Sequence, residues 1–212
     1  MPDEIGLFEA IYSQRAIRRL KPDPVSDELV DKLIEAATKA PSGGNTQPWA
    51  FVVVRDAGAK RAIGEWYLDA WNRTYGAIPQ DQRGNLPANL TRVYGAAEHL
   101  ANHLAEVPVF IIACIKGAAR AGRGHMAGFY GSIYPAVQNV LLAARGLGLG
   151  ASLTTLHKLH EDEVKELLGI PDDVETVALI PVGHPIGRYG PTTRAPVAEV
   201  THYERWGGAK GG

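Results

Sequence analysis

Cysteine is almost absent from this chain, which carries a single one, Cys114, among its 212 residues. One thiol cannot form an intrachain disulfide, so packing and hydrogen bonding must hold the fold together. Cys114 lies in an apolar run with no basic residue beside it, which favours a buried strand residue over a reactive thiol.

An excess of either charge is also absent, because 22 basic residues stand against 23 acidic ones and leave a net charge of −1 at pH 7. Such a balance provides no broad electrostatic field for binding nucleic acid or an anionic membrane. Long apolar runs are missing too, since no stretch approaches the about 20 apolar residues that span a bilayer. We therefore expect neither a nucleic acid nor a membrane as partner.

The N-terminus begins with Asp3 and Glu4 and lacks a basic stretch followed by an apolar run, so it is unlike a secretory signal. We expect a cytoplasmic protein. A chain of 212 residues is long enough for one sizeable core, and we expect a single domain.

Periodic apolar residues and Gly/Pro breaks predict a small set of strands among helices. The predicted helices cover residues 6–14, 26–40, most of 60–106 apart from a polar stretch around 79–87, 128–145 and 160–168. The predicted strands cover residues 49–54, 107–115, 151–155 and 176–182. This order indicates an α+β or α/β sandwich.

The sequence does not support several familiar functional motifs. Gly146-x-Gly148 matches part of a dinucleotide fingerprint, but it follows a predicted helix, whereas the fingerprint needs a strand before it and a helix after it. His99 and His103 are spaced for one helix face but lack a third ligand, so we expect no metal site. Neither a Gly-x-Ser-x-Gly elbow nor a phosphate-binding Gly-Lys-Ser/Thr loop occurs, which removes the usual support for a hydrolase or a nucleoside triphosphatase.

Two short runs near the N-terminus indicate a site for an anionic, planar ligand. Arg15 and Arg18 in the first run offer permanently charged guanidinium groups, which can donate paired hydrogen bonds to a phosphate or to the edge of a polar ring. The second run, 40–49, is too rich in proline and glycine for a helix or a central strand, and its glycines allow backbone N–H groups to approach a ligand. Ser42, Asn45 and Gln47 add side-chain donors and acceptors to this loop.

These runs and four later segments resemble the flavin-dependent nitroreductases, and the resemblance covers nearly the whole chain. Arg15-Ala16-Ile17-Arg18 resembles the family's Arg-Ser-x-Arg pattern, and Pro41 to Trp49 resembles its Pro-Ser-Ser-x-Asn-x-Gln-Pro-Trp loop. The segment 136–148 is similar to the central dimer helix of the family, and the segments 181–185, 193–196 and 202–206 are similar to its C-terminal signature.

The resemblance implies a fold and an assembly. It implies an α+β, three-layer α/β/α sandwich with a mixed, mainly antiparallel sheet, in an intertwined homodimer with FMN at each of two subunit interfaces. Residues 1–206 would form one FMN-binding domain, with a helical insertion over the flavin at about 60–106 and a flexible tail at 207–212.

It also implies roles for ten residues, which contact FMN from both subunits. Arg15, Ala16 and Arg18 would bind the phosphate and the N1–C2 edge of the ring, Pro41, Ser42, Gly43 and Asn45 would reach the same FMN from the other subunit, Leu153 and Thr154 would lie near N5, and Arg194 would bind the phosphate. Ala16 and Gly43 replace serines of the family pattern, so we expect weaker FMN affinity at most. The flavin carries the chemistry, so no catalytic residue is assigned.

The implied activity is hydride transfer from NAD(P)H, the co-substrate, through FMN to a nitroaromatic, quinone or similar small electron acceptor by a ping-pong mechanism. Two alternatives stay open: a protein that holds or senses FMN with little turnover, and an enzyme that uses oxygen on the reduced flavin. Trp66, Trp71 and Tyr94 are candidates to stack on an aromatic acceptor, although helix packing explains Trp71 equally well. Arg120 and Arg123 are candidates for a 2′-phosphate, but solvated loop arginines are the favoured interpretation.

Overall fold

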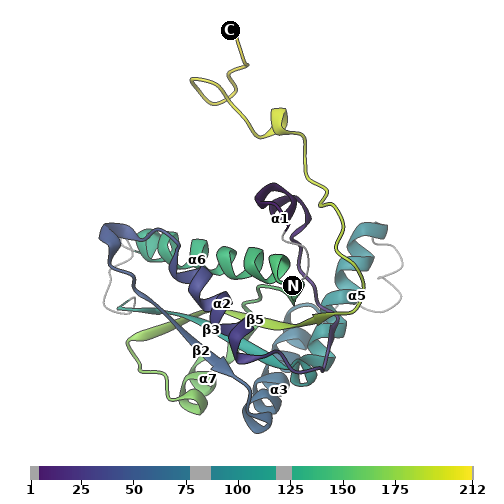
Figure 1. Ribbon diagram of the computed structural model, residues 1–212, viewed down its shortest axis with the longest axis vertical. Helices are drawn as coiled ribbons and strands as arrows, with labels where there is room; N and C mark the ends of the chain where they lie inside the picture. The colour runs from purple at the N-terminus through teal and green to yellow at the C-terminus, as the bar shows by residue number, and fades with distance from the viewer. Residues whose placement is uncertain (1–4, 77–86, 118–125, 212) are drawn as a thin grey trace.

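Two layers of helices enclose a central sheet in the computed structural model, which describes residues 5–76, 87–117 and 126–211 (Figure 1). The sheet has the strand order β1-β5-β3-β2, with β4 also paired to β5. Its strands are β1 (Leu20–Lys21), β2 (Trp49–Val54), β3 (Val109–Lys116), β4 (Gly150–Ala151) and β5 (Val174–Pro185). Every strand pairing among the described residues is antiparallel, and the predicted α+β sandwich is confirmed.

Both faces of the sheet are buried, as the central strand β3 shows most clearly. Ile111 and Ile115 belong to the core on one face, whereas Phe110 and Ile112 belong to the core on the other. Because successive side chains of a strand point to opposite faces, a strand that is apolar throughout needs a cover on each side. Cys114 is buried in this strand, where burial raises the pKa of its thiol to about 12 and keeps it protonated.

One face is covered by α2 (Asp27–Thr38) and α6 (Met126–Gly146). Ser26 caps α2 as its sequence predicts, since its hydroxyl accepts a hydrogen bond from the N–H of Leu29 at 3.4 Å. Asn139 of α6 donates its amide to the carbonyl of Ala36 at 3.0 Å and ties the two helices together.

The other face is covered by α3 (Ala57–Thr74), α5 (Ala88–His103) and α7 (Glu161–Leu168). Ile63, Tyr67 and Trp71 are four residues apart in the sequence and are therefore buried along one side of α3. Gly169 ends α7 with φ of 64°, a left-handed conformation that suits glycine.

Two segments project from this sandwich (Figure 1). They are α1 (Leu7–Ser13) and the residues after β5, 186–211, which we call the C-terminal arm. Arg145 at the end of α6 contacts both segments where they leave the sandwich. It donates to the Ser13 hydroxyl at 2.8 Å, and its guanidinium lies 4.5 Å from the ring centre of Tyr189. Beyond that point the arm is exposed, and Trp206 keeps 91% of its surface accessible.

The structure differs from the predicted elements mainly at the sheet edge. The predicted strand 151–155 is limited to Gly150 and Ala151, and Thr154 rejoins β5 through an isolated bridge to Leu179. β5 runs on to Pro185 because β1 and β4 pair with its far end, and this pairing of β1 is not evident from the sequence. Within the described residues, none of the helices has the length and apolar character needed to cross a membrane.

His157 gives a test of the packing on the α3 side of the sheet. It is 1% exposed, and both ring nitrogens lack a hydrogen-bond partner within the described structure. Burial, helped by the nearby charge of Lys158, lowers its pKa to about 4. The unfolded chain, with a pKa near 6.5, takes up a proton over this range while the folded chain does not, so acid favours unfolding.

We therefore predict that the unfolding free energy falls as pH drops from about 6.5 toward 4, with about 3 kcal/mol of this loss due to His157. The substitution His157→Leu should flatten that part of the profile. Urea unfolding at a series of pH values measures the difference, and identical slopes for both proteins would contradict it.

Candidate functional site

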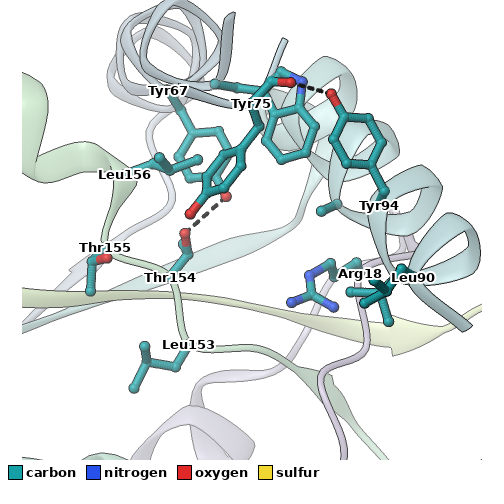
Figure 2. A pocket seen from close by; sticks show the side chains of 12 residues that line it. Arg18, Tyr67, Tyr75, Leu90, Tyr94, Leu153, Thr154, Thr155 and Leu156 are labelled. Carbon is teal, nitrogen blue, oxygen red and sulfur yellow. Dashed lines mark hydrogen bonds between the residues drawn. The ribbon is translucent and has the colours of Figure 1, made fainter. Parts of the chain in front are cut away.

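A cavity of about 480 Å³ opens between α3, α5 and two segments at the edge of the sheet (Figure 2). This size is within the usual range for small-molecule sites. Its lining comes from the segments after α1 and β4 and from the two helices: Arg18, Tyr67, Trp71, Tyr75, Leu90, Val93, Tyr94, Ala97, Leu153, Thr154, Thr155 and Leu156.

Aromatic side chains form the helical wall of the cavity. The Trp71 ring lies 5.2 Å from that of Tyr75 and 5.1 Å from that of Tyr94, measured between ring centres. The Tyr94 hydroxyl donates to the Tyr75 carbonyl and so links α5 to the end of α3. Trp66 does not line this cavity but stacks on His160, with the ring centres 6.4 Å apart. Two of the three predicted stacking residues are thus at the cavity.

Among the described residues, Arg18 is the one charged side chain in the lining. The segment that carries it is held against the edge of the sheet, because the N–H of Ile17 donates to the Ala151 carbonyl at 3.0 Å. Burial lowers the pKa of the Arg18 guanidinium, which is nevertheless a cation at neutral pH. Its guanidinium has no carboxylate partner in the described part of the chain, so the cavity holds a half-buried positive charge that an anionic or electron-rich ligand would complement.

Thr154 and Leu153 lie across the cavity from α5 (Figure 2). The Thr154 hydroxyl is 2.9 Å from the phenol oxygen of Tyr67, at hydrogen-bonding distance. Burial raises the pKa of Tyr67, so the phenol keeps its proton at neutral pH.

Hydrogen bonds within the loop 41–49 and from the loop to α6 hold it in place. Ser42 accepts a hydrogen bond from the N–H of Gln47 at 3.0 Å, and Gly43 donates its N–H to Ser132 of α6 at 3.3 Å. Gly44, Asn45 and Gln47 all have positive φ, at 58°, 54° and 48°. Left-handed backbone at non-glycine residues is a strained feature that is often found at ligand sites.

This loop lies away from the Arg18 cavity. It packs where α6 begins, beside a smaller cavity of about 210 Å³ lined by Gly43 and Ser132 among others, whereas α5 is at the opposite end of the sandwich (Figure 1). One chain therefore brings together Arg18, Leu153 and Thr154, but it does not bring Pro41, Ser42, Gly43 or Asn45 to them.

The remaining predicted residues are exposed. Arg15 and Ala16 follow α1 just before Arg18, and Arg194 lies in the C-terminal arm, where its guanidinium donates to the Thr193 carbonyl at 2.8 Å. Arg120 and Arg123 lie outside the described residues.

The histidine pair on α5 is stacked. The rings of His99 and His103 stack with their centres 4.2 Å apart, and no group of three suitable His, Cys, Asp or Glu ligands occurs in the described ranges.

Comparison with known proteins identifies the family. The Nitroreductase family matches residues 11–184, which is most of the chain. The chain belongs to the nitroreductase family. An NADH dehydrogenase of Thermus thermophilus is 30% identical over 205 residues, with 90% of this chain and 92% of that protein covered. Iodotyrosine deiodinase 1 of Rattus norvegicus is 31% identical over 180 residues, with 84% of this chain and 61% of the deiodinase covered.

The fold is shared with solved structures as well. Oxidized iodotyrosine deiodinase, crystallised with FMN and 3-iodo-L-tyrosine, superposes with a TM-score of 0.73 at 23% identity, with 94% of this chain and 100% of that chain covered. Family membership supports a flavin oxidoreductase, and the names of the relatives span different reactions.

Part of the cavity is not evident from the sequence. Tyr67 and Tyr75 are spaced for one face of a helix, but nothing in this spacing indicates that the face meets Thr154 as well as the core. Leu90 and Val93, exposed apolar residues of α5 that line the cavity, carry no local signal beyond the helical pattern itself.

Gly150 provides a test of how the Arg18 segment is positioned. A Cβ at this residue would lie 2.6 Å from Leu20 Cδ2 and 2.8 Å from Ile17 Cγ2, the residues that flank Arg18 in the segment. We predict that Gly150→Ala lowers the unfolding free energy by about 1–3 kcal/mol, because the segment must move outward. Gly95→Ala on α5 meets no atom within 4 Å and should be neutral or stabilising in the same urea titration. Equal effects of the two substitutions would contradict the tight packing.

Proposed function

We propose that this protein is an FMN-dependent oxidoreductase that uses NADH or NADPH to reduce an electron-poor acceptor such as a nitroaromatic or a quinone. The observation that supports it most is Arg18, a half-buried cation without a carboxylate partner in the described chain, set in a cavity that is mainly apolar and aromatic. Such a cavity suits a ligand that is flat and apolar over most of its surface and electron-rich at one edge.

The residues present fit FMN in size and in chemistry. The cavity of about 480 Å³ has flat aromatic side chains on its helical wall and the Arg18 guanidinium near the edge of the sheet. We propose that Arg18 holds the N1–C2 edge of the ring, where it would stabilise negative charge. Leu153 and Thr154 would lie beside N5, and Arg15, Ala16 and Arg194 would bind the phosphate.

The other side of the ring is proposed to come from a second copy of the chain. Pro41, Ser42, Gly43 and Asn45 would supply it, because their loop is too far from Arg18 to serve the same site within one chain. The exposed apolar residues of the C-terminal arm also support a homodimer, since Val197, Val200 and Trp206 have no cover in the described chain.

When bound, FMN would supply the hydride chemistry itself. The protein would orient the ring through Arg18 and Thr154, and the aromatic wall of Trp71, Tyr75 and Tyr94 would exclude water from the face that receives the acceptor. No general base or nucleophile is required, and none is assigned. The acceptor would stack within this wall.

An absorption spectrum of the purified protein with FMN, followed by anaerobic titration with NADH and with NADPH, tests the proposal. Loss of flavin absorbance on addition of either nucleotide, and its return on addition of menadione or a nitroarene, is the expected result. A bound flavin that neither nucleotide reduces would instead indicate a protein that only holds or senses FMN. A protein that binds no FMN would contradict both functions.

Arg18 provides the sharpest substitution. We predict that Arg18→Ala weakens FMN binding roughly 10- to 100-fold, because a charge-assisted hydrogen bond contributes about 1.5–3 kcal/mol. The control is Arg61→Ala, which removes an exposed arginine of α3 that does not line the cavity. Isothermal titration of the apoproteins with FMN measures both dissociation constants, and equal constants would contradict the assigned role of Arg18.

A further inference from the structure

Two hydrogen bonds to one residue of β5 hold the backbone of Thr154. Its N–H donates to the Leu179 carbonyl at 3.0 Å, and the N–H of Leu179 donates to the Thr154 carbonyl at 2.9 Å. The backbone of Thr154 is therefore fixed beside the cavity, and a contact with Tyr67 places its hydroxyl oxygen, which leaves the direction of the hydroxyl proton to be decided. A threonine hydroxyl can donate one hydrogen bond while accepting others.

Tyr67 approaches this hydroxyl from α3 (Figure 2). Its side chain is 4% exposed and belongs to the core on the α3 side of the sheet, so its ring is fixed by packing. The two oxygens are 2.9 Å apart, and either hydroxyl could donate on distance alone. Which of the two hydroxyls donates depends on what else each oxygen can contact.

The difference in exposure favours donation by Tyr67. Thr154 is half-exposed at the cavity, whereas Tyr67 is 4% exposed, so a ring bound in the cavity would meet the Thr154 hydroxyl. The single hydroxyl proton of Thr154 would then go to an acceptor atom of the ring, and the Tyr67 phenol, which keeps its proton at neutral pH, would donate to Thr154 Oγ1. With its oxygen already engaged as an acceptor, Thr154 has its own proton available for a ligand.

We propose that Tyr67 is a positioning residue: it donates to Thr154 Oγ1 and thereby directs the Thr154 hydroxyl proton toward an acceptor atom of the ring bound in the cavity. This inference rests on the proposed function, because it requires a flavin ring beside Thr154. Tyr67 acts through Thr154 and is not itself assigned a contact with the ring.

A double-substitution cycle separates this role from simple packing. The proteins compared are wild type, Tyr67→Phe, Thr154→Val and the double variant, each as the full chain with FMN. Phe keeps the ring of Tyr67 and Val keeps the shape of Thr154, so each removes little more than a hydroxyl. The measured quantities are the midpoint potential of bound FMN and its dissociation constant.

Both single substitutions should shift the midpoint potential in the same direction, and each should weaken FMN binding roughly 3- to 10-fold, as expected for one neutral hydrogen bond. The double variant should match Thr154→Val alone, because Tyr67 has nothing to orient once that hydroxyl is gone. Thr154→Ser, which restores a hydroxyl, should recover most of the wild-type potential.

Tyr130→Phe is the matched control. The Tyr130 hydroxyl donates to a Glu175 carboxylate oxygen at 2.9 Å, the same distance as between Tyr67 and Thr154, but it lies outside the cavity. Its removal should leave the potential of the bound flavin unchanged.

Incorporation of 3-fluorotyrosine at residue 67 tests the same point without loss of packing or of the hydroxyl. Fluorine makes the phenol a stronger donor, so the potential should shift in the direction opposite to that of Tyr67→Phe. If Tyr67→Phe fails to fold, the midpoint potential of the fluorinated protein still tests the positioning role.

Additive shifts in the double variant, or an unchanged potential in Tyr67→Phe or in the fluorinated protein, would overturn the positioning role while leaving the proposed function intact. A wild-type protein that binds no FMN would overturn both. The two failures are distinguished by the wild-type titration alone.

Discussion

The burial of both faces of β3 and β5 is the constraint from which the remaining structure follows. A strand such as Val109–Lys116 offers apolar side chains in both directions, so helices must cover the sheet on two sides. Because β3 pairs with only one edge of β5, the other edge is free to pair with the short strands β1 and β4. The chain that enters and leaves these short strands carries Arg18 and Thr154. The edge of the sheet thus determines where the candidate site lies.

The same architecture divides the proposed site in two. Arg18 and Thr154 are fixed at one end of the sandwich, and the strained loop that contains Gly43 and Asn45 is fixed near the start of α6 by Ser132. Neither part can reach the other without disrupting the core between them. The exposed C-terminal arm, which leaves the sandwich beside Arg145, offers the apolar surface with which a second copy could bring the two parts together. The proposed homodimer would account for both the divided site and the uncovered arm.

Local sequence signals predicted those features that depend on local physics. Ser26 capping α2, the buried spacing of Ile63, Tyr67 and Trp71, and the apolar β3 each follow from patterns within a few residues. The bridge from Thr154 to Leu179 and the contact of Tyr67 with Thr154 join residues far apart in the chain, so no local pattern contains them. The roles of Arg15 and Arg194 were implied by family resemblance and remain predictions, because one chain leaves both exposed.

The most direct test of a site shared between two chains is FMN stoichiometry in a mixed dimer. One subunit carries Arg18→Ala and the other carries Asn45→Asp, which keeps a residue tolerant of left-handed backbone but adds a charge that repels an anionic ligand. Separate affinity tags isolate the mixed species, and each variant alone should bind FMN poorly. If the site is shared, one of the two sites in the mixed dimer combines an intact Arg18 with an intact loop, and the dimer should bind one FMN with wild-type affinity. A mixed dimer without any high-affinity FMN would contradict the shared site.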